Sequence, residues 1–278
     1  MSFWMSLSTN LAFEIIVTAN RPKSLENQPA VIVTGSNSGI GAASSRLLAE
    51  RGFRVFAGSH HSQQIASQLP TQQTLQTIAL DVENQSSILA AKETVSTELK
   101  GTALLGIVNI AGIAVPGPLE MIPVEMLRQQ LEVNVTGQFA VTQAFLPCLA
   151  APGGRIVFIG STSGSVAKPF RGAYCASKFA LRALAESWRH ELEPLGQSVC
   201  LIEADKIDTP IWRKSRQRLE KIFEQASPEI QHKYPDVNQM FPLPTEDELG
   251  CFKSARDVAE AVWDVLTSAN PPPEIKIA

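Results

Sequence analysis

The chain is poor in the features that mark secreted, metal-binding and nucleic-acid-binding proteins. Its 278 residues include four cysteines, none of which form a Cys-x-x-Cys pair. Isolated thiols are typical of a reducing compartment rather than of a disulfide framework or a zinc site. The four histidines also lack metal-ligand spacing, so no metal site is expected. Because the net charge is −3, there is no basic excess, and no nucleic-acid partner is expected.

Long hydrophobic runs are absent as well. The apolar run from Leu11 to Val17 contains Glu14 and is too short to span a membrane. No Lys or Arg precedes Arg21, so a secretory signal is not expected either. We therefore expect a cytoplasmic protein, in which residues 1–27 form an N-terminal extension and residues 28–278 form a single folded domain.

Short apolar runs alternate with helical patterns along most of the chain. Helices are predicted over 86–99 and 123–149, and another one carries Tyr174. This alternation predicts an α/β fold, a doubly wound parallel sheet with helices on both faces. The predicted strands are Ala30–Thr34, Phe53–Gly58, Thr74–Leu80, Ala103–Asn109, Gly154–Gly160, Val199–Glu203 and, at the edge, Glu274–Ala278.

A glycine-rich turn follows the first predicted strand. Gly35, Gly39 and Gly41 stand between that strand and a helical pattern that stops at Gly52. Bare glycines let the backbone approach a phosphate, and a helix N-terminus favours an anion. A tight turn that needs glycine and binds nothing is the alternative. No Gly-Lys-Ser/Thr follows, so the turn is not a P-loop.

Ser161, Tyr174 and Lys178 surround the predicted junction between a buried strand and the next helix. Tyr174 and Lys178 stand four residues apart, so they share one helix face. An ammonium one turn away is expected to lower the pKa of a phenol, and a serine hydroxyl can bind a substrate oxygen. A surface tyrosine beside a solvated lysine is the alternative. Asn134 lies in an apolar helical stripe and is either functional or bonded to a neighbouring backbone.

With these motifs in view, the chain resembles the short-chain dehydrogenase/reductase family from about Ala30 to the C-terminus. The Thr34-Gly-x-x-x-Gly-Ile-Gly turn is similar to the family's cofactor turn. Asp81-Val82 is similar to its adenine contact, and Asn109-x-Ala-Gly112 is similar to its motif after the fourth strand. The residues similar to its catalytic tetrad are Asn134, Ser161, Tyr174 and Lys178.

The resemblance implies a Rossmann-type fold, a homodimer or homotetramer, and a nicotinamide cofactor for the interconversion of an alcohol and a carbonyl compound. It makes Tyr174 the acid/base, has Lys178 hold the nicotinamide ribose, and has Asn134 anchor a water. The cofactor contacts that it implies are Gly35, Ser36, Ser38, Gly39, Ile40, Gly41, Ser59, His60, Asp81, Val82, Asn109, Ala111, Gly112, Tyr174, Lys178, Ile207 and Thr209.

Two positions depart from the family pattern near the expected cofactor. Ile110 interrupts the Asn-Ala-Gly motif, and Ala204-Asp205 replaces a usual Pro-Gly. These departures are the basis for an alternative function, a catalytically silent dinucleotide-binding sensor or scaffold. The second predicted strand ends in Ser59-His60 without a carboxylate, which favours NADP over NAD.

The segment from about 209 to 250 has weak periodicity apart from a charged helical pattern over 213–223. Long insertions after a last strand are often lids, so we expect a lid over the substrate there. Resemblance to relatives that act on lipophilic alcohols implies a lipophilic secondary alcohol or ketone as the small-molecule partner.

Overall fold

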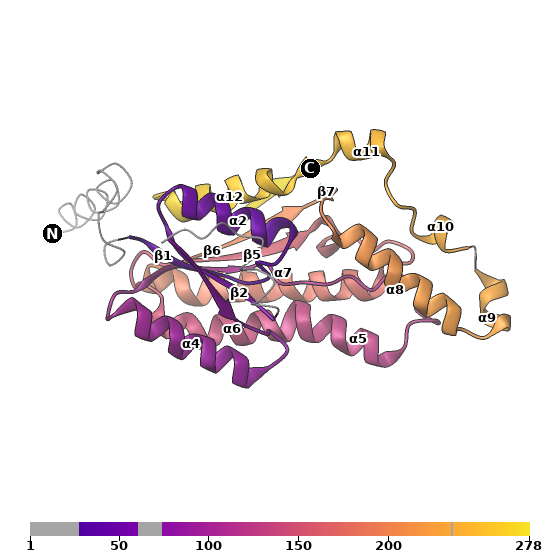
Figure 1. Ribbon diagram of the computed structural model, residues 1–278, viewed down its shortest axis with the longest axis horizontal. Helices are drawn as coiled ribbons and strands as arrows, with labels where there is room; N and C mark the ends of the chain where they lie inside the picture. Colours follow the sequence, from indigo (N-terminus) through magenta and orange to yellow (C-terminus); the bar gives the residue numbers. More distant parts are fainter. Residues whose placement is uncertain (1–27, 61–73, 235) are drawn as a thin grey trace.

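Seven parallel strands form the central sheet of the structure, a computed structural model that describes residues 28–60, 74–234 and 236–278 (Figure 1). The strands lie in the order β3-β2-β1-β4-β5-β6-β9. The expected N-terminal extension, residues 1–27, lies outside the described residues. The strands are β1 (Ala30–Val33), β2 (Arg54–Ser59), β3 (Leu75–Ala79), β4 (Leu104–Asn109), β5 (Arg155–Ser161), β6 (Ser198–Ala204) and β9 (Glu274–Ile277).

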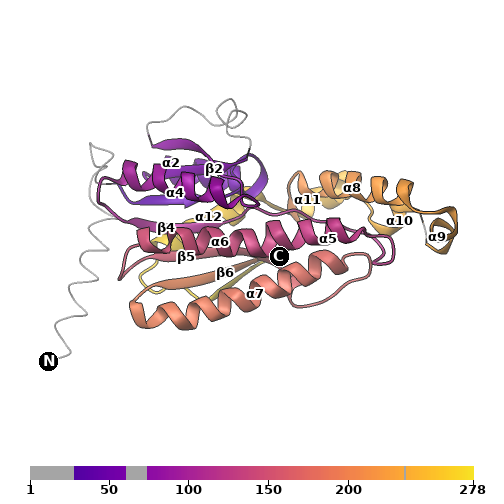
Figure 2. The same ribbon diagram turned by 90° about the horizontal axis from the view of Figure 1, so that it is seen from below.

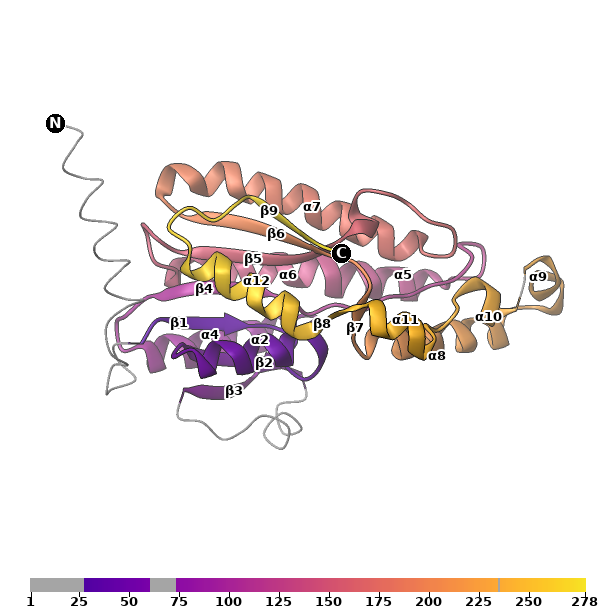
Figure 3. The same ribbon diagram turned by 90° about the horizontal axis from the view of Figure 1, so that it is seen from above.

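Helices cover both faces of this sheet. Figure 3 shows α2 (Gly39–Glu50) and α12 (Ala255–Thr267) on one face. Figure 2 shows the other face, covered by α4, α5, α6 and α7. Each face has its own apolar core, and β1 and β5 are buried along their whole length because both of their faces are covered. The predicted doubly wound α/β fold is confirmed. The four helices are α4 (Gln85–Leu99), α5 (Val124–Leu131), α6 (Gly137–Phe145) and α7 (Gly172–Leu192).

The single helix predicted over 123–149 is divided in the structure. A π-helical turn, Glu132–Thr136, separates α5 from α6, and Asn134 lies inside it. After Phe145 the chain forms a 3₁₀ turn over Leu146–Cys148. Pro147 in that turn has no amide hydrogen, so an α-helix cannot continue through it.

The segment expected as a lid is largely helical, and the helical pattern predicted over 213–223 falls within its first helix. It contains α8 (Ile211–Gln225), α9 (Pro228–Lys233), α10 (Val237–Met240) and α11 (Glu246–Cys251), which extend past the end of the sheet (Figure 1). The last three helices are too short to show a helical period in the sequence. Leu219 of α8 packs with Met240 and Phe241 in a separate apolar cluster. Two short strands, β7 (Ile207–Asp208) and β8 (Lys253–Ser254), pair with each other at the two ends of the segment.

None of the helices in the described ranges combines the length and the apolar composition that a membrane crossing requires.

Candidate active site

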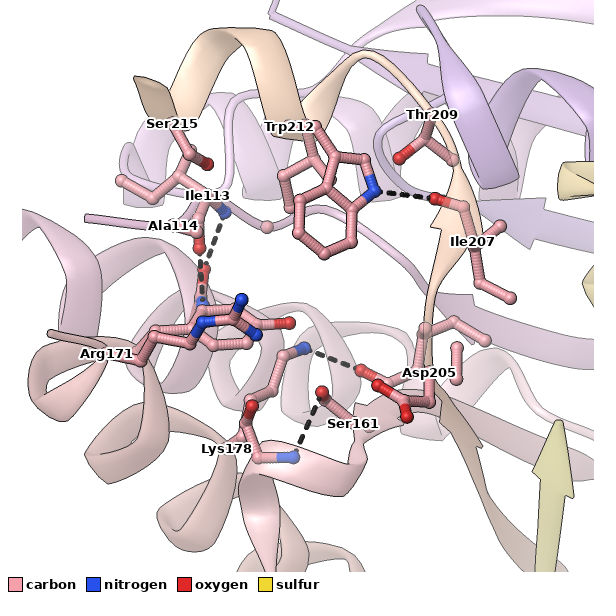
Figure 4. Close-up of a pocket in the computed structure, with 18 of the residues that line it drawn as sticks. Ile113, Ala114, Ser161, Arg171, Lys178, Asp205, Ile207, Thr209, Trp212 and Ser215 are labelled. Atoms are coloured by element: carbon pink, nitrogen blue, oxygen red, sulfur yellow. Dashed lines mark hydrogen bonds between the residues drawn. The ribbon is translucent and has the colours of Figure 1, made fainter. Parts of the chain in front are cut away.

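Ser161, Tyr174 and Lys178 line one cavity at the carboxyl end of the sheet. Ser161 is the last residue of β5, while Tyr174 lies in the first turn of α7 and Lys178 lies one turn later. Ser161 and Lys178 are buried, and Tyr174 is half-buried. Figure 4 shows Ser161 and Lys178 at the floor of this cavity. The structure therefore brings together the three side chains that the sequence analysis singled out.

The pKa of Tyr174 is raised above its usual value, which corrects the expectation that Lys178 lowers it. Burial of the phenol is the main cause, and the carboxylate of Asp205 adds to the rise. A hydrogen bond with Ser161 and the positive charge of Arg171 act in the opposite direction. The Nζ of Lys178 lies 5.8 Å from the centroid of the tyrosine ring. Tyr174 is therefore a protonated phenol at neutral pH in the protein alone.

Lys178 is the most perturbed cation of the site. Its side chain is 5% exposed, and its Nζ donates a hydrogen bond of 2.7 Å to the carbonyl oxygen of Ile159. Burial lowers the pKa of Lys178 to about 8 because the charged ammonium loses its hydration. Lys178 therefore gives up its proton far more easily than a lysine in water.

Asn134 uses its amide to hold the backbone of the cavity wall. Its Oδ1 accepts a hydrogen bond from the Ile113 amide at 2.8 Å, and its Nδ2 donates to the Ile113 carbonyl at 2.9 Å. The same Nδ2 donates to the Ser177 hydroxyl at 3.1 Å. Both amide hydrogens of Asn134 thus have protein acceptors. The side chain therefore bridges the segment after β4 and α7, and its expected role as a water anchor stays a prediction.

Two further amides, which the sequence analysis missed, continue this bridge. Gln130 accepts from the Val115 amide and donates to the Ile113 carbonyl, both at 2.7 Å. Gln138 donates to the Ala111 carbonyl at 2.8 Å. Amides at 130, 134 and 138 recur every four residues along one helix face. That spacing was the available sequence signal for a row of side chains that fixes the chain after β4.

The glycine turn borders a second groove, next to the cavity. Gly35 and Gly39 have φ values of +68° and +53°, and a Cβ at Gly41 would lie 2.1 Å from the Gly35 carbonyl oxygen. The turn therefore requires glycine for its own packing. The expected cofactor residues that line this groove are Gly35, Ser38, Gly39, Ile40, Gly41, Ser59, His60, Asp81, Val82, Ala111, Gly112 and Thr209.

Ser36 and Asn109, expected as cofactor contacts, are buried with their side chains bonded inside the protein. The Ser36 hydroxyl donates to the Val33 carbonyl and accepts from Ser45. The Asn109 amide donates to Thr142 at 2.9 Å. Their side chains therefore stabilise the ends of β1 and β4 rather than face the groove. Ile207 lines the cavity with Tyr174.

The two departures from the expected motif lie at the cavity. Ile110 borders both the groove and the cavity, and its amide donates to the Thr34 hydroxyl at 2.9 Å. Asp205 lines the cavity together with Tyr174 but not the groove, and its amide donates to the Ile277 carbonyl. The carboxylate of Asp205 therefore raises the pKa of Tyr174 and does not border the glycine turn.

The groove fits a dinucleotide. Ser38 is the N-cap of α2 but makes no capping hydrogen bond through its side chain, so the first-turn amides of this 12-residue helix have no side-chain acceptor there. Such a helix terminus binds pyrophosphate through its amides and its dipole. Within the described ranges, no group of three His, Cys, Asp or Glu side chains is placed to hold a metal ion.

Comparison with known proteins agrees with this geometry. A family model described as short chain dehydrogenase matches residues 29–220. The chain is 35% identical to a 3-amino-tetrahydro-pyrrolizinone reductase of Xenorhabdus hominickii, over 87% of this chain and 84% of that protein. It is 32% identical to the mitochondrial D-beta-hydroxybutyrate dehydrogenase of Rattus norvegicus, over 87% of this chain and 74% of that one.

A solved structure has a similar fold. The 3-ketoacyl-(acyl-carrier-protein) reductase of Brucella melitensis, complexed with NADH, aligns with a TM-score of 0.71 at 20% identity, covering 91% of this chain and 98% of that one. Fold, matched family model and relatives agree. The chain belongs to the short-chain dehydrogenase/reductase family of oxidoreductases, whose members bind NAD(H) or NADP(H).

Proposed function

We propose that this protein interconverts a lipophilic secondary alcohol and the corresponding ketone, with Tyr174 as the acid/base. The observation that carries the proposal is that Ser161, Tyr174 and Lys178 line one cavity that adjoins the glycine-turn groove. The rest of the cavity wall is mainly apolar, which suits a lipophilic substrate. Its apolar members include Ile110, Ile113, Ile159, Ile211, Trp212 and Phe241.

The proposed roles follow from the contacts of each side chain. The Ser161 hydroxyl binds the substrate oxygen beside the Tyr174 phenol, with which it already shares a hydrogen bond. Because the pKa of Tyr174 is raised, the phenol holds the proton that a ketone oxygen gains during reduction. Asn134 and Gln130 hold the opposite wall in place through the backbone of Ile113. The nicotinamide, when bound, supplies or accepts the hydride.

In the cofactor site, we propose the helix terminus and the glycine turn as the pyrophosphate contact and Lys178 as the contact to the nicotinamide ribose. The second strand ends at Ser59 and His60 follows it; both residues line the groove, and neither is a carboxylate. A carboxylate at this point binds the ribose hydroxyls in NAD-preferring proteins, so its absence supports NADP. Fluorescence titration with NADPH and NADH tests this preference, and tighter binding of NADH would contradict it.

We also propose that residues 209–250 act as a lid. Thr209, Trp212 and Phe241 from this segment line the cavity, and the β7–β8 pair closes the base of the segment. From the family resemblance we propose a homodimer or homotetramer, which sedimentation would test. All four cysteines are free thiols, as is typical of a reducing compartment, and this supports a cytoplasmic location.

The direct assay is the absorbance of reduced nicotinamide during incubation with a panel of lipophilic ketones and secondary alcohols. The proposal expects turnover of at least one pair with NADPH or NADP. Tight cofactor binding without turnover of any member would favour the alternative, a silent sensor or scaffold.

A further inference from the structure

Arg171 places a positive charge in the wall of the cavity, and none of the carboxylates that the structure describes forms a salt bridge with it. The residue is half-buried, lines the cavity, and stands one helical turn before Tyr174. No salt bridge to Arg171 occurs within the described ranges, although its charge acts on the phenol of Tyr174. A partly desolvated guanidinium without an anionic partner is costly for a fold, so it suggests a ligand group that completes it.

Aromatic rings hold this guanidinium at the cavity. Its Cζ lies 5.3 Å from the ring centroid of Phe241 and 5.7 Å from that of Trp212. Trp212 is itself fixed, because its indole donates to the Ile207 carbonyl at 2.9 Å. Rings at this distance stabilise a cation, but they leave the N–H donors of the guanidinium fork available in its plane.

Ser215 is a second, independent sign of a polar ligand group. It is 1% exposed and lines the same cavity, and among the described residues its Oγ has no hydrogen-bond partner. Figure 4 shows Ser215 and Arg171 on the same side of the cavity, with the serine hydroxyl turned inward. A buried hydroxyl without a partner is rare, because its desolvation is then uncompensated.

Asp205, the carboxylate that lines this cavity, lies on the other side. In Figure 4 it is opposite Arg171, with Ser161 between the two. A substrate whose oxygen lies at Ser161 therefore has the guanidinium of Arg171 on one side and the carboxylate of Asp205 on the other. An acidic group on the substrate is repelled by Asp205 and attracted by Arg171, which fixes how the molecule enters.

We infer that Arg171 and Ser215 form a carboxylate-binding subsite, and that the substrate is an oxo acid or the corresponding hydroxy acid. The inference rests on the proposed function, because it places the reacting ketone or alcohol carbon at Ser161 and Tyr174. The guanidinium fork donates two parallel hydrogen bonds to a carboxylate, and the serine hydroxyl donates a third. The apolar remainder of the cavity takes the carbon chain between the two oxygen-bearing groups.

The test is calorimetric titration with straight-chain oxo acids that differ in the spacing between ketone and carboxylate, each paired with its primary amide. Levulinate and levulinamide are one such pair. Binding is measured for the free protein and for the protein saturated with NADPH. We expect the best acid to bind at least about tenfold more tightly than its amide, since a bidentate charged contact is stronger than a neutral one.

Variants then assign this preference to the two side chains. Arg171→Gln and Ser215→Ala should each reduce the ratio of acid affinity to amide affinity, Arg171→Gln by about tenfold or more. Arg213→Gln is the matched control for Arg171→Gln. Arg213 lies on α8, as Ser215 does, but it is exposed and does not line the cavity. It should leave the ratio unchanged.

Equal affinity for acids and amides, no detectable binding of any acid, or a preference that survives Arg171→Gln would each overturn the inference. These outcomes are separate from failure of the proposed function. Turnover of neutral ketones with no preference for acids would refute the subsite alone, whereas selective binding of acids without any turnover would support the subsite and refute the proposed function.

Discussion

At the scale of single residues, Lys178 links the site to stability. Burial lowers its pKa from 10.5 to about 8, so the native state binds fewer protons than the unfolded state between these two pH values. The free energy of unfolding therefore rises with pH across this window. Below pH 8 the buried ammonium is charged and lowers the free energy of unfolding by its full amount. Lys178→Met removes this dependence. The free energy of unfolding of the wild type should gain about 3 kcal/mol relative to the variant between pH 7 and pH 10.5.

Urea unfolding of both proteins in the absence of cofactor, from pH 7 to pH 10.5, measures the difference. Parallel pH profiles would show that the ammonium of Lys178 is as well solvated in the native state as in the unfolded chain.

The next prediction concerns the effect of Asp205 on the pKa of Tyr174. Its carboxylate contributes to the raised pKa of Tyr174, so Asp205→Asn should lower that pKa. The chain has two tyrosines, which makes absorbance of the phenolate a clean measurement in a Tyr234→Phe background. A Lys206→Gln variant is the control and should leave this pKa unchanged, since Lys206 also lines the cavity but is not among the charges that shift the pKa of Tyr174. An unchanged or higher pKa in Asp205→Asn would contradict this role.

At the scale of secondary-structure elements, the row of amides on α5 and the π turn should stabilise the wall after β4. Gln130→Met keeps the approximate shape of the side chain but leaves the Val115 amide without its acceptor, while the Ile113 carbonyl keeps Asn134 as a donor. The variant should lose roughly 1–3 kcal/mol of unfolding free energy, since a buried group left unpaired costs about this much. Gln143→Met, an exposed position on α6, is the control for chemical denaturation. Equal stability of the two variants would show that Gln130 does not stabilise the wall after β4.

The seven strands of the central sheet were predictable from the sequence to within one residue at each end, whereas the short β7 and β8 were missed. Strands covered on both faces require continuous apolar runs, and β1 and β5 have them. The π turn was not predictable, because its extra residue leaves no mark in the composition of 132–136. The helix α11 was missed although its capping box, Thr245 with Glu248, can be read from the sequence.

The part of the candidate site that could be predicted from the sequence comes from one short stretch of chain. Ser161, Tyr174 and Lys178 lie close because one strand leads into one helix. The contributions of Arg171, Ser215 and Asp205 depend on packing between segments far apart in the chain. Their orientation toward one cavity could not be read from the sequence.

At the scale of the whole molecule, the segment 209–250 should respond to ligands as a unit. Its helices α9, α10 and α11 are short, and much of their surface is exposed, whereas the sheet is buried. Hydrogen exchange in the cofactor-free protein should therefore be faster in this segment than in β4 and β5. NADPH with a bound substrate should slow it, because Trp212 and Phe241 then close on an occupied cavity. Equal exchange with and without ligands would exclude a lid.

The central claim is that Tyr174 exchanges the proton, and turnover by Tyr174→Phe tests it most directly. The substitution removes one hydroxyl from a half-buried ring that lines the cavity but not the groove. Turnover should fall by about 10²–10⁴-fold, the usual contribution of a positioned acid/base. Affinity for NADPH, measured by fluorescence in the same variant, should remain close to that of the wild type. Retention of more than about a tenth of the wild-type rate on the best substrate would contradict the account.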